Sequence, residues 1–194
     1  LKLEPYVQYL YDVPVIPDSS YSAIIMENAW SLADELKNDG TGLNYGIDFT
    51  FERFLHKGYY YLITASLFEA KYTGGDRIQR NSRYNRNYVV NFLFGKEWKV
   101  RDNNILGING KFHFLGGNRN IPINLESSIN QHDIVLDYSR AFEEHDPSIY
   151  QLDLTLTYKV NKKKYSGSWA LQVMNVLGRK EFYGYSYNYR SGMP

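Results

Sequence analysis

Apolar and polar residues alternate with a period of two along most of the chain. From residue 43 every odd position through Phe51 is large and apolar, and every even position through Glu52 is polar or glycine. Because successive side chains of a β-strand point to opposite faces, such a segment has one apolar and one polar face. The pattern predicts seven strands, with weaker alternation in the third and the last: residues 1–13, 43–54, 58–72, 87–100, 104–116, 148–160 and 167–178.

The lengths of the strands and of their connections narrow the fold class. The predicted strands run to about 12 residues, whereas strands of soluble sheets average about 5–6 and tilted membrane strands need about 9–11. Connections 14–42, 73–86 and 117–147 are long and polar, and those around residues 56–57, 101–103 and 161–166 are short. Transmembrane barrels have short turns on one side and long loops on the other. We therefore predict an all-β, antiparallel up-and-down segment of a transmembrane β-barrel, with residues 1–194 as a single domain.

Aromatic residues strengthen this interpretation. The chain has 19 tyrosines, and its aromatic residues gather near both ends of the predicted strands, as in the interfacial girdles of a barrel. Near the short connections lie Phe54, Tyr59, Tyr60, Tyr61, Trp98, Tyr158 and Trp169, and near the long ones lie Tyr9, Tyr11, Tyr45, Tyr72, Tyr88 and Tyr150.

Composition excludes several other classes. The net charge of +1 gives no field that would favour nucleic acid, and no apolar run approaches the roughly 20 residues of a membrane helix. The chain has no cysteine, no phosphate-binding loop and no dinucleotide-binding glycine pattern, so no cofactor is predicted. Of the four histidines only His113 lies on a predicted strand, and no nucleophile-elbow serine is present. An enzyme is not expected.

Seven strands do not close a barrel of this kind, which uses an even number from about eight upward. We therefore expect the chain to be part of a larger barrel, with residues 179–194 as another outer loop. Within 14–42, the apolar residues Ala29, Leu32, Ala33 and Leu36 have helical spacing and are compatible with a short helix that ends at Asp39 and Gly40.

The alternative is a secreted, soluble β-sandwich that binds glycans. Exposed tyrosines stack well on sugars, and the tail carries an alternating series that would suit this role: Tyr183, Tyr185, Tyr187 and Tyr189. The same series would also serve as a structural belt above the last strands. The sandwich predicts shorter strands and no alternation of long and short loops.

The amino-acid sequences of several segments resemble those of TonB-dependent outer-membrane receptors. The segments are Gly40–Asp48, Lys57–Tyr61 followed by Ala65–Phe68, Arg80–Asn85 leading into Asn87–Asn91, Gly95–Glu97, Gly116–Arg119, Leu152–Asp153 and Trp169–Val176. Each is weakly specific, and their order and spacing together are more specific. The resemblance covers most of residues 1–178.

The resemblance implies an outer-membrane barrel of about 22 strands. It also implies a plug domain of the same full-length chain, TonB acting through that plug, and import of a scarce nutrient such as an iron chelate (siderophore), cobalamin, a glycan or a peptide. A surface lipoprotein would be a further partner, and membrane lipid would surround the wall. The sequence in hand has no plug, no TonB-contact segment and no final strand ending in an aromatic residue, which we expect of a C-terminal part of such a barrel.

Two sets of residues are candidates for contact with plug or ligand. The first would line the lumen, or merely hydrate it: Asn44, Asp48, Glu52, Asn91, Lys111, His113 and Asp153, with Thr50, Glu97, Asn109, Thr155 and Lys159 as further members. The second is the arginine series Arg77, Arg80, Arg83 and Arg86, whose guanidinium groups suit an anionic ligand or would instead anchor the loop. Residues 143–146 and 131–133 contain acids and histidines, but their spacing is not that of a closed zinc set, so no metal is predicted.

Overall fold

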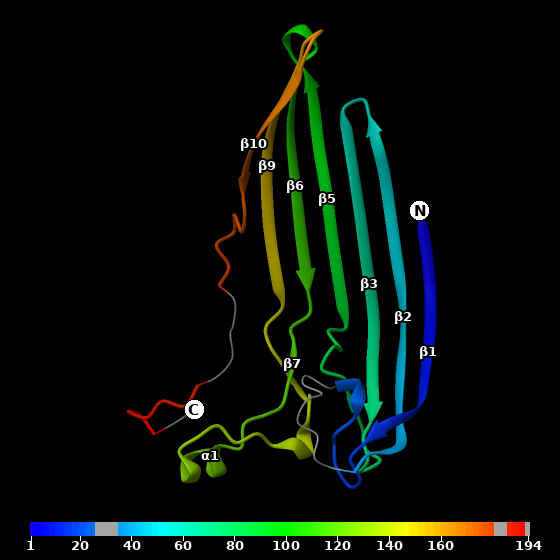
Figure 1. Cartoon of the computed structure of the whole chain (residues 1–194), viewed down its shortest axis with the longest axis vertical. Coiled ribbons are helices and arrows are strands. Elements are labelled where there is room, and N and C mark those ends of the chain that lie inside the picture. The colour runs from blue at the N-terminus through cyan, green and yellow to red at the C-terminus, as the bar shows by residue number, and fades with distance from the viewer. Residues whose placement is uncertain (26–34, 181–185, 193–194) are drawn as a thin grey trace.

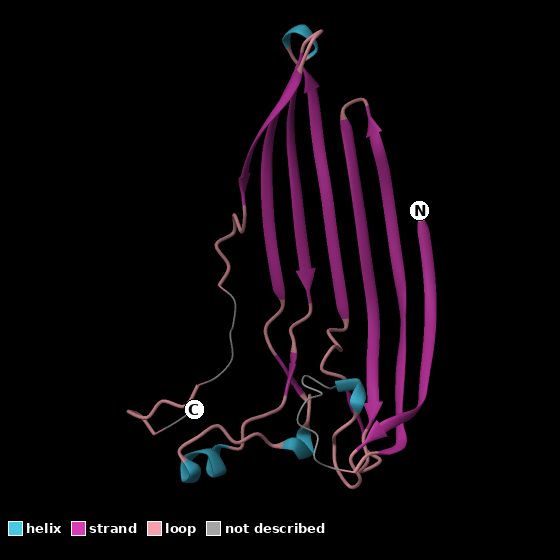
Figure 2. Ribbon diagram, in the orientation of Figure 1, coloured by secondary structure: helices cyan, strands magenta, loops and turns pink. Residues whose placement is uncertain are grey.

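The computed structural model of the chain describes residues 1–25, 35–180 and 186–192. It is dominated by one antiparallel sheet in a single layer (Figures 1 and 2). Seven strands lie side by side in chain order: β1 (Lys2–Val15), β2 (Lys37–His56), β3 (Tyr59–Thr73), β5 (Tyr88–Lys99), β6 (Ile105–Leu115), β9 (Ile149–Asn161) and β10 (Ser166–Val173). The predicted long antiparallel meander is therefore confirmed.

Short and long connections lie at opposite ends of the sheet (Figure 1). Gly58 lies in the tight β2–β3 turn, where Lys57 and Gly58 both have positive φ, 51° and 79°. Two such residues in a two-residue hairpin loop match the twist of the flanking strands. A side chain at Gly58 would also collide with the carbonyl oxygen of Glu97. The long connections and the helix α1 (Leu125–Gln131) gather at the other end.

Strand register sorts the side chains by polarity. Leu3, Phe49 and Ala65 are cross-strand partners, and this row continues through Val90, Phe114 and Tyr150. The next residues along β2 and β3, Thr50 and Thr64, point to the other face and belong to a polar row. We call the two sides the apolar face and the polar face. The alternation predicted along single strands thus extends across most of the sheet.

Two strand boundaries differ from the prediction by more than two residues. β2 begins at Lys37, not at residue 43, because Val13 and Val15 pair with Gly40 and Lys37 and so extend the β1–β2 hairpin. Gly40 does not end an element there, since it leaves room for the Val15 side chain. β10 ends at Val173, not at residue 178, because Asn175 has a φ of 49°, which interrupts extended backbone.

Three short strands and the helix were not predicted. β4 (Gln79–Asn81) pairs with β3, and β7 (Arg119–Asn120) pairs with β8 (Glu144–His145) as a separate ribbon. The helix α1 begins after Asn124, whose side chain accepts a hydrogen bond from the Ser127 amide. Three-residue 3₁₀ turns occupy Ala23–Ile25, Arg101–Asn103 and Tyr138–Arg140. Of the four residues with helical spacing, Ala29, Leu32 and Ala33 lie outside the described residues, and Leu36 is described and is not in a helix.

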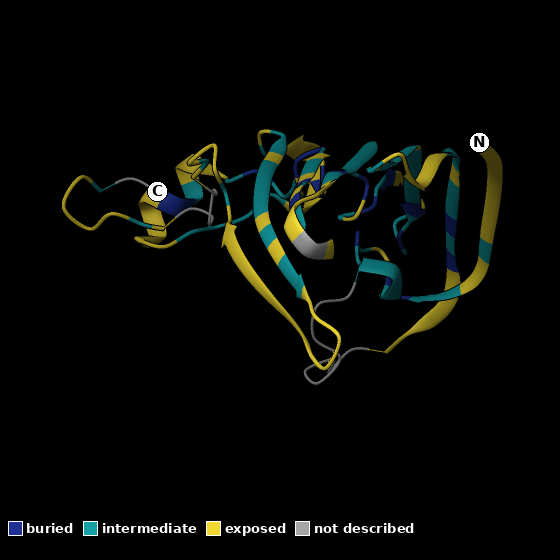
Figure 3. Ribbon diagram, turned by 90° about the horizontal axis from the view of Figure 1, so that it is seen from above, coloured by how far each residue is buried: buried dark blue, intermediate teal, exposed yellow. Residues whose placement is uncertain are grey.

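The edges of the sheet are open. β1 and β10 are the outermost strands and are not paired with each other in the described part of the chain. Figure 3 shows the exposed colouring of the strand at the N-terminus, and every residue of β10 is exposed. Within the described residues the main sheet is therefore open and does not close into a barrel.

Candidate functional site: the polar face and the loop layer

Polar side chains of neighbouring strands lie beside one another on the polar face. Asn44 is opposite Gln8, Asn91 is opposite His113, and Lys111 is opposite Asp153. All seven residues predicted to line the lumen belong to this face: Asn44, Asp48, Glu52, Asn91, Lys111, His113 and Asp153. The structure brings them onto one surface, and their role in a lumen stays a prediction.

Hydrogen bonds connect this face across strands. Asn91 Nδ2 donates to Thr64 Oγ1 at 3.2 Å, and His113 Nδ1 lies 2.5 Å from Asn91 Oδ1. The Tyr60 hydroxyl donates to Asn109 Oδ1 at 2.6 Å. The histidine contacts an amide, not a carboxylate or a hydroxyl nucleophile, so this pair does not have the geometry of a catalytic dyad.

Charges on the polar face are balanced locally. Lys159 Nζ lies 2.9 Å from Glu97 Oε1, and Lys111 faces Asp153 across the strands. Asp153 also accepts hydrogen bonds from Gln151 Nε2 and from the Asn175 amide, both at 2.8 Å. Such half-exposed pairs contribute little to stability. They make a surface of mixed donors and acceptors, which suits contact with polar solutes or with a polar protein surface.

A small packed core, which we call the loop layer, lies at the end of the sheet with the long connections. Tyr72 is 1% exposed, and its ring meets that of Phe142 edge-on with centroids 6.2 Å apart. Ala141 is buried with them, and Ile24, Ile25 and Ile121 pack around this core. Connections 14–42 and 117–147 thus meet Tyr72 of β3 in one cluster.

Arg80 joins the 73–86 connection to the 117–147 connection beside the loop layer. Its guanidinium forms two bonds to the Asp76 carboxylate, at 2.7 and 2.9 Å, and donates to the Ser139 carbonyl at 3.3 Å. Only 7% of the Arg80 side chain is exposed. The hydrogen bond from Arg80 lowers the pKa of Asp76, with burial acting in the opposite direction.

The Asp76 pKa predicts how the loop layer responds to acid. Because the folded pKa is depressed, the stabilisation is present above the ordinary value of 3.8 and is lost as pH falls through the folded pKa. We expect faster hydrogen exchange of residues 137–141 in that acid range. The pKa of Asp137 is lowered as well, first by a hydrogen bond from the Ser139 side chain, so both carboxylates contribute to the acid response. The Asp76→Asn variant separates them. We expect its exchange to be faster already at neutral pH and its pH profile to lack the contribution of Asp76. Identical profiles in both proteins would contradict the assignment.

The other three arginines have separate environments. Arg86 donates to the Gly116 carbonyl at 3.4 Å and to Asn118 Oδ1. Arg83 lies over the Tyr84 ring, 5.5 Å from its centroid, and Arg77 is exposed with a φ of 61°. Arg80 and Arg86 therefore anchor loop segments. Ligand binding by any of the four stays a prediction.

Arg119 and two asparagines form a network that sequence reasoning missed. Arg119 Nε donates to the Asn85 carbonyl at 3.0 Å, and its terminal nitrogens reach Asn87 Oδ1 at 2.8 Å and the Glu143 carbonyl at 3.3 Å. Asn85 is fully buried and donates to Glu69 Oε2 at 3.0 Å. Arg119 and Asn85 both lie in segments that resemble the receptor sequences. However, no local sequence pattern indicates that two residues 34 positions apart are in contact.

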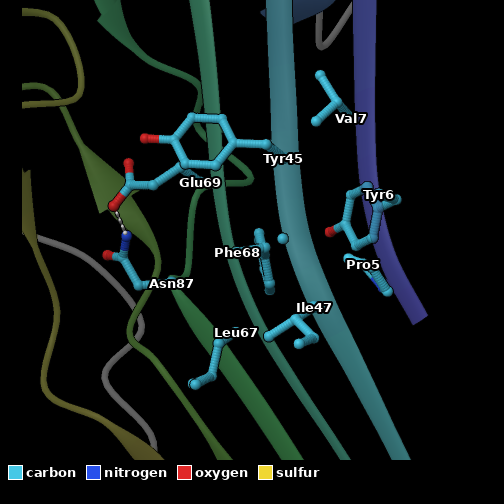
Figure 4. Close-up of a pocket in the computed structure, with 10 residues that line it drawn as sticks. Pro5, Tyr6, Val7, Tyr45, Ile47, Leu67, Phe68, Glu69 and Asn87 are labelled. Carbon is cyan, nitrogen blue, oxygen red and sulfur yellow. Dashed lines mark hydrogen bonds between the residues drawn. The ribbon is translucent and has the colours of Figure 1, made fainter. Parts of the chain in front are cut away.

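An open pocket of about 570 Å³ crosses β1, β2 and β3 (Figure 4). Its lining includes Val7, Ile47 and Leu67 of the apolar face, with Glu69 and Asn87 at one side. Glu69 already accepts hydrogen bonds from Asn85 and Asn87, the latter at 2.7 Å. The pocket contains none of the residues predicted as site residues.

No protein-family model, curated protein or solved structure matches the chain. Within residues 1–25, 35–180 and 186–192, no group of three or more histidines, cysteines or acids is placed to hold a metal. In the same residues, no helix has the length and apolar character needed to cross a membrane.

Proposed function

We propose that these residues form part of the wall of a transmembrane β-barrel in the bacterial outer membrane. The observation that carries this proposal is an extended apolar face that no other layer of the described chain covers. Leu67 on β3 and Leu156 on β9 are interior to the sheet, yet they are 58% and 48% exposed. A contiguous exposed apolar surface of this extent marks an interaction with membrane or partner.

Segregation of polarity also supports the proposal. In a barrel, lipid outside and a polar interior favour strands whose two faces differ, and the register aligns most side chains in this way. The exceptions include Leu62, Phe68 and Leu93 on the polar face, and Arg53, Glu69, Lys71 and Lys96 on the apolar face. Tyr88, Phe114 and Tyr150 bound the apolar face on one side, and Trp98, Tyr158 and Trp169 bound it on the other. A soluble glycan-binding sandwich would need a second sheet over this face, and the described residues contain only a two-stranded ribbon beside the main sheet.

The proposed transport function rests on the resemblance of the strand sequences to those of TonB-dependent receptors. On that basis the full protein imports a scarce nutrient, with the polar face directed to a plug domain and the long loops directed to the outside. The mixed donors and acceptors of the polar face suit contact with a polar plug surface. Catalysis is not part of the proposal.

Single cysteines on β9 provide the test, because the chain has no cysteine of its own. Nitroxide labels at Leu154 and Leu156 are expected to collide mainly with oxygen dissolved in the bilayer. Labels at Thr155 and Thr157, on the opposite face, are expected to collide mainly with a water-soluble nickel chelate. Equal access of the chelate to both pairs in vesicles would refute the transmembrane wall.

A further inference from the structure

The short connections are strongly basic. Residues 57–58, 100–104 and 162–165 contain Lys57, Arg101, Lys162, Lys163 and Lys164, and one acid, Asp102. These links lie together at one end of the sheet (Figure 1). The long connections, in contrast, carry both signs of charge, with Asp76, Asp137, Glu143 and Glu144 among the arginines.

A row of large apolar side chains, three of them aromatic, lies next to these basic links on the apolar face. Trp98, Leu106, Tyr158 and Trp169 are successive cross-strand partners on β5, β6, β9 and β10. Trp98 is 44% exposed and Trp169 is 76% exposed. Indole and phenol rings at such a boundary place an apolar body beside hydrocarbon and a polar group beside headgroups.

Lys96 joins the two features. It lies on the apolar face of β5, between Phe94 and Trp98 in the alternation, where a charge is unexpected. Its Nζ is 3.3 Å from the Tyr59 ring centroid, 5.9 Å from that of Trp98 and 3.3 Å from the Lys57 carbonyl oxygen. The side chain thus directs its ammonium group to the short link while its stem lies along the apolar face, as lysines do at a membrane interface.

We propose that this end of the sheet is a binding surface for the phosphates of anionic phospholipid headgroups. We call it the basic rim: Lys57, Lys96, Arg101, Lys162, Lys163 and Lys164. Positive charge directly above an aromatic belt matches the layering of a leaflet, in which phosphates lie outside the acyl chains. The inference rests on the proposed membrane wall and adds the lipid class that the short-link side recognises.

The tryptophans that border the rim report on its lipids. The chain has three tryptophans in all, of which Trp98 and Trp169 border the rim. Replacing Trp30 by phenylalanine leaves these two as fluorescent reporters. The protein is placed in mixed bilayers of phosphatidylcholine and phosphatidylglycerol, with one lipid or the other brominated on its acyl chains. We expect brominated phosphatidylglycerol to quench several-fold more strongly per lipid. In Lys163→Gln/Lys164→Gln the ratio is expected to approach one, since each basic residue changes binding to an anionic surface about fivefold.

The control removes the same charge elsewhere. Lys37→Gln/Lys180→Gln replaces two exposed lysines away from the short links and should keep the preference of the parent protein. Equal quenching by both lipids in the parent would overturn the basic rim and leave the membrane wall standing. Absence of quenching by either lipid would overturn both. A preference abolished by excess inorganic phosphate would indicate a site for free phosphate and overturn the lipid assignment.

Discussion

Leu154→Arg is expected to destabilise the bilayer-inserted sheet by about 2–4 kcal/mol, the cost of an arginine on the lipid face near the bilayer midplane. Leu154 lies on the apolar face of β9 between Gly110 on β6 and Val173 on β10. An arginine there has no partner in its row and must reach toward an interface. The measurement is reversible unfolding in denaturant from lipid vesicles. Phe49→Arg on β2 is expected to have an effect of the same sign.

Its matched control is Thr155→Arg, one residue further along the same strand. Thr155 is on the polar face opposite Asn109, so an arginine there remains in polar surroundings and the loss of stability should be small. Asp48→Asn, on the polar face of β2, should also cost little. Equal losses at positions 154 and 155 would show that the two faces do not meet different solvents.

Asp76→Ala is expected to destabilise the loop layer by about 1.5–3 kcal/mol, because the almost fully buried Arg80 loses the carboxylate that its guanidinium binds, while Asp76 itself is 19% exposed. The remaining charge would be Arg80, whose side chain is almost fully buried beneath Ser139. We expect release of the 117–147 connection before the sheet unfolds, measured as faster proteolysis and hydrogen exchange within that connection.

A double variant separates charge from packing. Asp76→Leu/Arg80→Met removes both charges while keeping apolar volume, and such replacements of buried pairs are often close to neutral. If the double variant loses as much protection as Asp76→Ala, packing or the Ser139 contact accounts for the effect, and the unpaired charge does not.

Sequence reasoning was most successful where one physical constraint acts along the whole strand. The period of two in β2 and β9 follows from the geometry of extended backbone, so facing and antiparallel order could be inferred residue by residue. It was less successful at Gly40 and Asn175. A glycine in β2 can mark a stop or make room for Val15, and only the tertiary contact decides between these roles. The seven-residue helix α1 was too short to produce a clear period.

For the candidate site, too, the face of each side chain could be predicted, but the contacts between side chains could not. Asn91 and His113 were assigned to one face by parity alone, whereas their mutual contact depends on the β5–β6 register. The loop layer was not predicted, since its contacts join residues as far apart as Arg80 and Ser139. The regular spacing of the four arginines suggested a shared role, but their side chains contact different partners. Regular spacing in a loop therefore does not make side chains point the same way.

The outermost strands have a consequence for assembly. β1 and β10 each present a line of amide and carbonyl groups that no strand of the described chain meets. In hydrocarbon each unpaired backbone group would cost several kcal/mol. The sheet is therefore stable inside a bilayer only when the outer edges of β1 and β10 are paired with further strands. We therefore expect insertion into the bilayer and closure of both edges to occur together.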